Sequence, residues 1–125
     1  MIKKSTPLSG KQITFDEGVM LVSRTDLEGI TTYVDSDFVD ISGYSEQELI
    51  GKKHNIIRHP ETPVEIHKDL WDTLKSGAPW TGMIKNLSKN GDYYWVYSNI
   101  TPVTTEDGNN EFMSVGVFPT ADQIE

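Results

Sequence analysis

The chain has 125 residues, which suits one domain with a buried core and is too short for two. A net charge of −8, carried by scattered acidic residues, argues against nucleic-acid binding, because that binding depends on clustered Lys and Arg. The absence of cysteine excludes disulfides, thiolate metal sites and cysteinyl-flavin photochemistry. We find no apolar run long enough to cross a membrane and no signal-peptide core, so we expect a cytoplasmic protein without direct membrane insertion.

The first half of the chain predicts a hairpin and then short helices. Residues 1–17 are polar and weakly patterned, and we expect them to lie outside the centre of the fold. Two β-favouring runs, 19–23 and 30–34, flank a turn-prone segment and predict a hairpin. Asp35 or Ser36 then caps a helix that ends at Gly43, and residues 45–48 form a capping box that starts the next helix.

The longest predicted helix begins at a second capping box, residues 62–65, with Pro63 at the first helical position. Its apolar stripe includes His67, and the helix stops near Gly77. Alternating residues then predict strands at 80–87, 93–103 and 112–118, the first two of which are joined by an Asn-Gly turn. This order of elements indicates an α+β domain with an antiparallel sheet and helices on one face.

The strand at 80–87 carries a possible ligand surface. Its alternation places Trp80, Gly82, Ile84 and Asn86 on one face and Thr81, Met83, Lys85 and Leu87 on the other. An aromatic surface, a gap and an amide together suit a planar heteroaromatic ligand. The alternative is a core tryptophan with Asn86 facing solvent, and the pattern alone favours that alternative.

The segment at 54–61 places two histidines, an arginine, an amide and a carboxylate close together. Pro60 biases His59 towards extended backbone, so we expect these side chains to spread from a loop. Arg58 can bind a phosphate or pair with Glu61. The spacing matches no common metal site, and we find no nucleophile elbow or phosphate loop, so the sequence indicates no enzyme.

These segments together resemble the PAS domain of bacterial aerotaxis receptors. The resemblance runs in order from about residue 18 to residue 120. Its most specific parts are the Arg-His-Pro segment ending at Pro60, the Trp-x-Gly at 80–82 and the Lys-Asn at 85–86. The motifs that carry it are Val-Asp-Ile-Ser-Gly-Tyr-Ser at 39–45, Glu-Leu-Ile-Gly at 48–51, His-Asn-Ile-Ile-Arg-His-Pro at 54–60 and Lys-Asn-Gly-Asp-Tyr-Tyr-Trp-Val at 89–96.

The resemblance implies a PAS fold: a five-stranded antiparallel sheet with short helices and one longer helix enclosing a pocket that binds FAD non-covalently. It implies a sensory domain at 18–120, preceded by a leader at 1–17 and followed by the start of a linker at 121–125. Such a domain reports redox state or oxygen to a chemotaxis-type output, as the cytoplasmic part of a membrane-anchored receptor. Its partners are the receptor's own signalling region or a second PAS copy in a homodimer. The implied cofactor-binding residues are Asp35, Asn55, Arg58, His59, Glu61, Trp80 and Asn86.

Three positions depart from the family pattern. Asp35 replaces an asparagine, Glu61 replaces an aspartate, and His67 replaces an aromatic residue. The last departure leaves open a haem-binding gas sensor with His67 as the axial ligand. A third hypothesis is a PAS domain without a cofactor that serves as a dimerisation or docking module.

Overall fold

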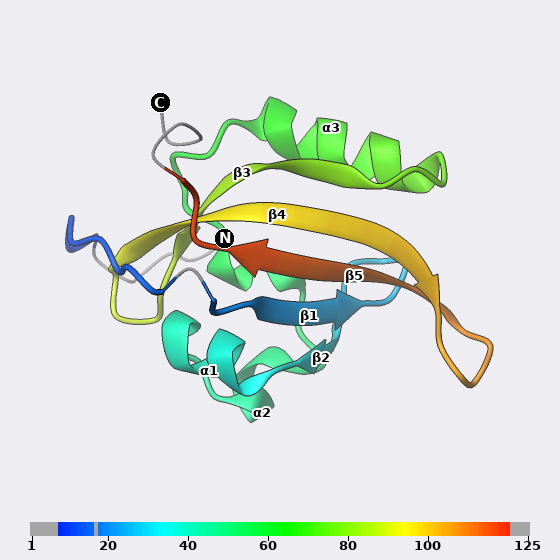
Figure 1. Cartoon of the computed structure of the whole chain (residues 1–125), viewed down its shortest axis with the longest axis horizontal. Helices are drawn as coiled ribbons and strands as arrows, with labels where there is room; N and C mark the ends of the chain where they lie inside the picture. The colour runs from blue at the N-terminus through cyan, green and yellow to red at the C-terminus, as the bar shows by residue number, and fades with distance from the viewer. Residues whose placement is uncertain (1–7, 17, 121–125) are drawn as a thin grey trace.

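The computed structural model describes residues 8–16 and 18–120 and shows one antiparallel sheet with helices along one face (Figure 1). The sheet has five strands in the order β2-β1-β5-β4-β3, which confirms the predicted α+β class. α3 runs alongside β3, while α1 and α2 lie beside β1 and β2 (Figure 1). The elements are β1 (Leu21–Thr25), β2 (Thr31–Val34), α1 (Ser36–Ser42), α2 (Glu46–Leu49), the 3₁₀ helix η1 (His54–Ile57), α3 (Val64–Lys75), β3 (Trp80–Leu87), β4 (Tyr93–Thr104) and β5 (Asn110–Val117).

The predicted N-terminal hairpin forms, but its first strand begins two residues later than expected. β1 pairs along its whole length with β5, from Leu21 opposite Gly116 to Thr25 opposite Phe112. Val19 instead donates its backbone N–H to Asp16 in a turn. The start of this strand is therefore determined by a distant partner strand, and local β propensity does not reveal it.

The two short helices have the caps that the sequence predicts. The carboxylate of Asp35 accepts a hydrogen bond from the Phe38 backbone at 2.8 Å, and Gly43 ends α1 with a φ of 77°. At α2, Ser45 and Glu48 form the reciprocal capping box.

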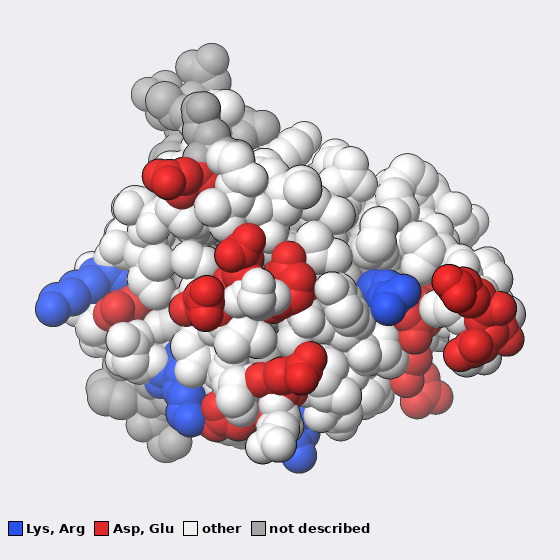
Figure 2. All heavy atoms as spheres, turned by 60° about the horizontal axis from the view of Figure 1, so that its bottom comes forward, with Lys and Arg blue, Asp and Glu red and all other residues white. Residues whose placement is uncertain are grey.

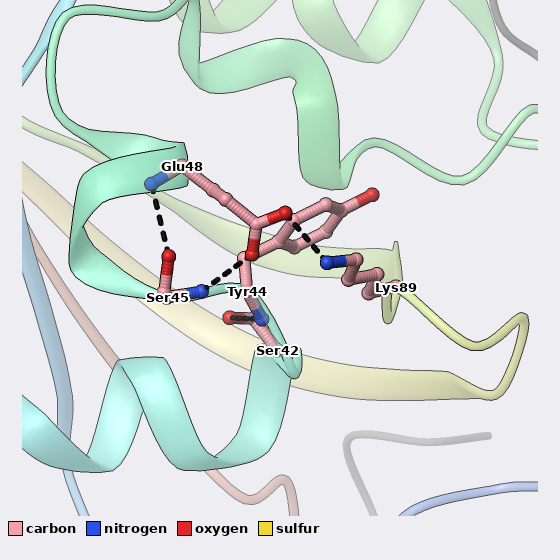
Figure 3. A network of polar contacts seen from close by, with 5 residues as sticks. All are labelled: Ser42, Tyr44, Ser45, Glu48 and Lys89. Carbon is pink, nitrogen blue, oxygen red and sulfur yellow. Dashed lines mark hydrogen bonds and ion pairs between the residues drawn. The ribbon is translucent and has the colours of Figure 1, made fainter.

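The α2 capping box is also connected to the sheet (Figure 3). The second oxygen of Glu48 accepts a hydrogen bond from Lys89 Nζ at 2.6 Å, and the Lys89 backbone N–H donates to the carbonyl of Ser42 at 2.8 Å. The turn between β3 and β4 is therefore bonded to the end of α1 and to the first turn of α2.

The prediction of a capping box at residues 62–65 is wrong. α3 starts at Val64 with Pro63 as its N-cap, and no side chain caps this end. The Thr62 hydroxyl donates instead to the Lys85 carbonyl of β3, at 3.2 Å. A buried threonine next to a strand edge satisfies its hydroxyl there, so the residue attaches the start of α3 to the sheet.

The alternation predicted for β3 is confirmed. Trp80, Ile84 and Asn86 are buried, while Thr81 is exposed. The inward side chains of the sheet join residues of α1, α2, η1 and α3 in one apolar core. That core contains Leu21, Val34, Phe38, Leu49, Ile57, Leu70, Leu74, Trp80, Ile84, Tyr94, Val96 and Phe112.

Within the predicted leader, residues 1–7 and 17 lie outside the described part, as do residues 121–125 of the predicted linker. The described residues of the leader run beside the first residues of β4: Ile13 N–H donates to Tyr93 at 2.7 Å, and Tyr93 N–H donates to Lys11 at 2.8 Å. Figure 2 shows acidic side chains spread over the face that carries α1 and α2, with few basic ones among them. The acidic residues on these two helices include Asp37, Glu46 and Glu48.

We expect Ser45→Ala to lower the free energy of unfolding by ~1 kcal/mol, because it removes the cap that binds the Glu48 backbone N–H. The measurement is urea unfolding followed by circular dichroism. The matched control is Ser36→Ala, which alters an exposed serine of α1 that is not a cap. Equal midpoints for the two variants would contradict a stabilising role for the α2 capping box.

Candidate cofactor-binding cavity

A cavity of about 500 Å³ lies between the inner face of the sheet, η1 and α3. Its size falls in the range of small-molecule and cofactor sites, and its wall has their usual character, apolar with a few polar groups. The apolar part of the wall is Leu21, Phe38, Ile57, Val64, Leu70, Trp71, Leu74, Ile84, Val96, Ile100 and Phe112. The polar part includes Ser23, His54, Asn55, Arg58, His67, Asn86, Ser98 and Ser114.

The sheet side of the cavity is made of small residues on neighbouring strands. Ser23 of β1 lies opposite Ser114 of β5, and Ser98 of β4 lies opposite Gly116 of β5. Four larger side chains at these positions would fill the space between the sheet and the helices. These residues are not among the predicted site residues, although the alternation of β4 and β5 places their side chains on the inner face.

Arg58 and Asn86 are brought together by an isolated antiparallel bridge between the end of η1 and β3. The same segment is held by His59 N–H, which donates to the Lys85 carbonyl at 3.4 Å, and by the Thr62 hydroxyl. Asn86 is 7% exposed and lines the cavity, so the alternative in which it faces solvent is wrong.

Arg58 also lines the cavity, and it forms no ion pair with any described residue. Its suggested partner, Glu61, pairs instead with Lys85 at 3.1 Å, so the alternative pairing of Arg58 with Glu61 is wrong. The guanidinium group is therefore available to a ligand. Asn55 lies at the exposed edge of the same cavity.

His59 and Glu61 lie outside the cavity wall. His59 is 3% exposed, and its Nδ1 accepts a hydrogen bond from the Glu61 backbone at 3.0 Å. Burial lowers the pKa of His59, and the charge of Lys85 lowers it further. Hydrogen bonding to Lys85 lowers the pKa of Glu61. The flavin contacts that the resemblance implies for these two residues stay predictions.

Trp80 anchors α3 to the sheet. Its indole Nε1 donates to the Asp69 carboxylate at 2.9 Å, and its ring lies across Gly82, where an added Cβ would come within 2.6 Å of a ring carbon. Trp80 is 8% exposed and is not part of the cavity wall. Asp35, the cap of α1, is likewise not part of the wall. The cofactor roles implied for both residues stay predictions.

Two neutral imidazoles face the cavity. Burial lowers the pKa of His54 to about 4, and its Nε2 is 3.0 Å from the Ser23 hydroxyl. Burial and the nearby charge of Arg58 lower the pKa of His67 to about 4. The Nε2 of His67 is buried and has no hydrogen-bond partner among the described residues. His54 belongs to the predicted 54–61 segment but is not among the predicted cofactor-binding residues.

A five-stranded antiparallel sheet whose helices enclose a cavity on one face defines a class of α+β domains. Within that class, the chain belongs to the family described as PAS fold, whose model matches residues 31–116. No helix in the described residues is long and apolar enough to cross a membrane. The same residues contain no group of three or more His, Asp or Glu side chains arranged to hold a metal ion.

Relatives and solved structures agree with this assignment. The chain is 40% identical to the aerotaxis receptor of Escherichia coli over 98% of its own length and 23% of the receptor. It is 31% identical to the nitrogen fixation regulatory protein of Klebsiella pneumoniae over 77% of its length and 19% of that protein. The chain therefore spans about a quarter or less of these relatives.

Two solved structures show the same fold. The light-state LOV domain of the blue-light photoreceptor Aureochrome1 has a TM-score of 0.71 at 18% identity, covering 82% of this chain and 83% of that chain. A PAS domain from Colwellia psychrerythraea has a TM-score of 0.70 at 24% identity, covering 81% of this chain and 86% of that chain.

We expect the ligand-free protein to lose stability as the pH falls from about 6.5, the ordinary pKa of histidine, towards about 4. Across this window the unfolded chain protonates His54 and His67, while the folded protein keeps them neutral, so protonation favours unfolding. The measurement is the free energy of unfolding in urea at pH 7 and pH 5. His67→Phe should reduce the difference, and an unchanged difference would contradict the buried neutral state of His67.

Proposed function

We propose that this chain is a sensory PAS domain that binds FAD non-covalently and reports redox state or oxygen to a chemotaxis-type signalling output. The observation that carries the proposal is the cavity at which Arg58 and Asn86 meet. The identity of 40% with the Escherichia coli aerotaxis receptor supports the same function.

The residues of the cavity fit a flavin dinucleotide. A flat ring system needs apolar walls with a few donors and acceptors, and here Ile84 and Phe112 supply apolar surface while Asn86 both donates and accepts. The guanidinium of Arg58, which forms no ion pair within the described part of the chain, suits the diphosphate that FAD carries. Gly29 and Gly116 in the wall add no side-chain bulk.

A bound flavin would supply a group whose charge and hydrogen-bonding pattern change on reduction. Asn86 can change its hydrogen bonding in response, since rotation of its amide exchanges a donor for an acceptor. Its strand neighbours Lys85 and Leu87 belong to the opposite face of the sheet. A shift of β3 at Asn86 would therefore reach that outer face, where the receptor's own signalling region or a second PAS copy would dock against residues such as Met83 and Leu87.

A second candidate is a haem-binding gas sensor. It is favoured by one observation: His67 lines the cavity with a neutral imidazole, the form that coordinates iron. The flavin proposal explains more of the cavity, because it also uses the unpaired Arg58 and the buried amide of Asn86.

We expect the freshly purified protein to be yellow, with the two-band absorption of oxidised flavin, and to release FAD when denatured. The measurement is a visible spectrum followed by chromatography of the released cofactor. A sharp Soret band that is lost in His67→Ala would instead support haem. A colourless protein that does not take up FAD would support a cofactor-free docking module.

We expect Asn86→Ala to weaken FAD binding and Trp80→Ala to destabilise the ligand-free fold. Asn86→Ala should weaken FAD retention about fivefold, because it removes one ligand hydrogen bond worth ~1 kcal/mol. Trp80→Ala should cost the ligand-free fold ~3 kcal/mol or more, because it removes a buried indole that joins α3 to β3. Melting temperatures with and without FAD separate the two effects.

The matched control for Asn86→Ala is Asn99→Ala, since Asn99 is an exposed asparagine of β4 outside the cavity. Equal FAD retention in these two variants would remove Asn86 from the site. A Trp80→Ala protein that keeps its ligand-free stability but loses FAD would give Trp80 the ligand-stacking role.

A further inference from the structure

His67 is an incompletely bonded group in the cavity wall. It is the fourth residue of α3, its ring lines the cavity, and its Nε2 is buried without a hydrogen-bond partner among the described residues. An unpaired nitrogen removed from water is unfavourable, and native proteins rarely keep one. His67 borders the cavity, so a ligand bound there can supply the missing partner if the ring turns towards it.

The other imidazole of the cavity does not share this property. His54 Nε2 lies 3.0 Å from the Ser23 hydroxyl, and the rings of His54 and Phe38 pack edge-to-face. His54 is therefore held by the protein itself. Of the two histidines, His67 is the one whose hydrogen bonding remains to be completed by a ligand.

The charges around His67 indicate which ligand group fits. Arg58, at the end of η1, is close enough to lower the pKa of His67, and it has no acidic partner among the described residues. Lys53 and Lys68 line the same cavity, where Lys68 is paired with Asp72 at 2.6 Å. Glu28 is the one carboxylate among the described residues of the wall. The balance of charge among the described residues of the wall is therefore positive.

We propose that His67 contacts the bound cofactor and, together with Arg58, binds a hydrogen-bond-accepting oxygen group on it. This inference rests on the proposed flavin-binding function. A neutral imidazole donates one N–H, and a guanidinium donates several and adds positive charge, so the matching group is a carbonyl or an anionic oxygen. In FAD, two parts have this chemistry: the carbonyl edge of the flavin ring and the diphosphate. His67 would thus help to determine which ligand the cavity selects.

The test uses the whole chain with its flavin removed and then restored. FAD affinity is measured by calorimetry for the wild type, His67→Phe and His67→Gln. We expect His67→Phe to weaken FAD binding about tenfold, because the ring shape is kept and the donor is lost. His67→Gln should recover most of the affinity, because its amide donates. Glu65→Gln, an exposed change on the same helix outside the cavity, is the control.

Two further measurements separate ligand contact from a structural role. The imidazole nitrogen resonances of His67 should shift when FAD is added, whereas those of His59, outside the cavity, should shift less. The ligand-free His67→Phe protein should melt no lower than the wild type, because an apolar ring of similar shape leaves no unpaired nitrogen. A His67→Phe protein that is destabilised without ligand and binds FAD normally would overturn the proposal.

Comparing riboflavin binding with FAD binding shows which part of FAD contacts His67. If His67→Phe weakens riboflavin and FAD binding equally, the partner is the flavin ring; if it weakens FAD binding alone, the partner is the diphosphate. FAD binding that is equal in all variants, with unmoved His67 resonances, overturns the role of His67 and leaves the proposed function intact. A wild type that binds no FAD overturns both.

Discussion

The attachment of residues 58–62 to the edge of β3 is the interaction on which the cavity depends. β3 is an outer strand of the sheet, and its free edge would otherwise expose unpaired backbone groups. The Lys85 carbonyl accepts from His59 N–H and from the Thr62 hydroxyl, and Arg58 bridges to Asn86. This short connection attaches the start of α3 to the sheet and brings Arg58 into the wall of the cavity.

The cavity also requires that the core should not collapse into it, and two features oppose collapse. Serines and a glycine occupy the centre of the sheet's inner face, where Ser98 and Gly116 lie opposite each other. Further along the sheet, Trp80 spans the distance between β3 and α3 and is fixed by its hydrogen bond to Asp69. A large side chain therefore lies between β3 and α3, while small side chains on β1, β4 and β5 leave room for the cavity. Burial of the apolar residues around this space stabilises the fold without filling it.

How far the sequence could predict this structure depended on the range of the interactions involved. Local signals narrowed the α1 cap to Asp35 or Ser36, of which Asp35 is the cap, and they were sufficient for the α2 capping box and the bounds of β3, because each is determined within a few residues. The start of β1 and the role of Thr62 were mispredicted, since both are determined by distant strands. Among the proposed site residues, Asn55, Arg58 and Asn86 meet at the cavity. The serines of its floor were missed because a serine in a strand has no local signal that distinguishes a cavity wall from a surface.

One strand joins the cavity to the opposite face of the sheet. Asn86 points inward, while the preceding residue, Lys85, has its ammonium group over the rings of Tyr93 at 4.6 Å and Trp95 at 5.9 Å and pairs with Glu61. The carbonyl of the same Lys85 holds residues 58–62. Under the proposed function, a ligand that displaces Arg58 or Asn86 also displaces the backbone that positions the Lys85 ammonium group on the outer face. The size of any such signal is limited by how differently the two ligand states bond to those residues, because a ligand shifts an equilibrium only by its difference in affinity for the two conformations.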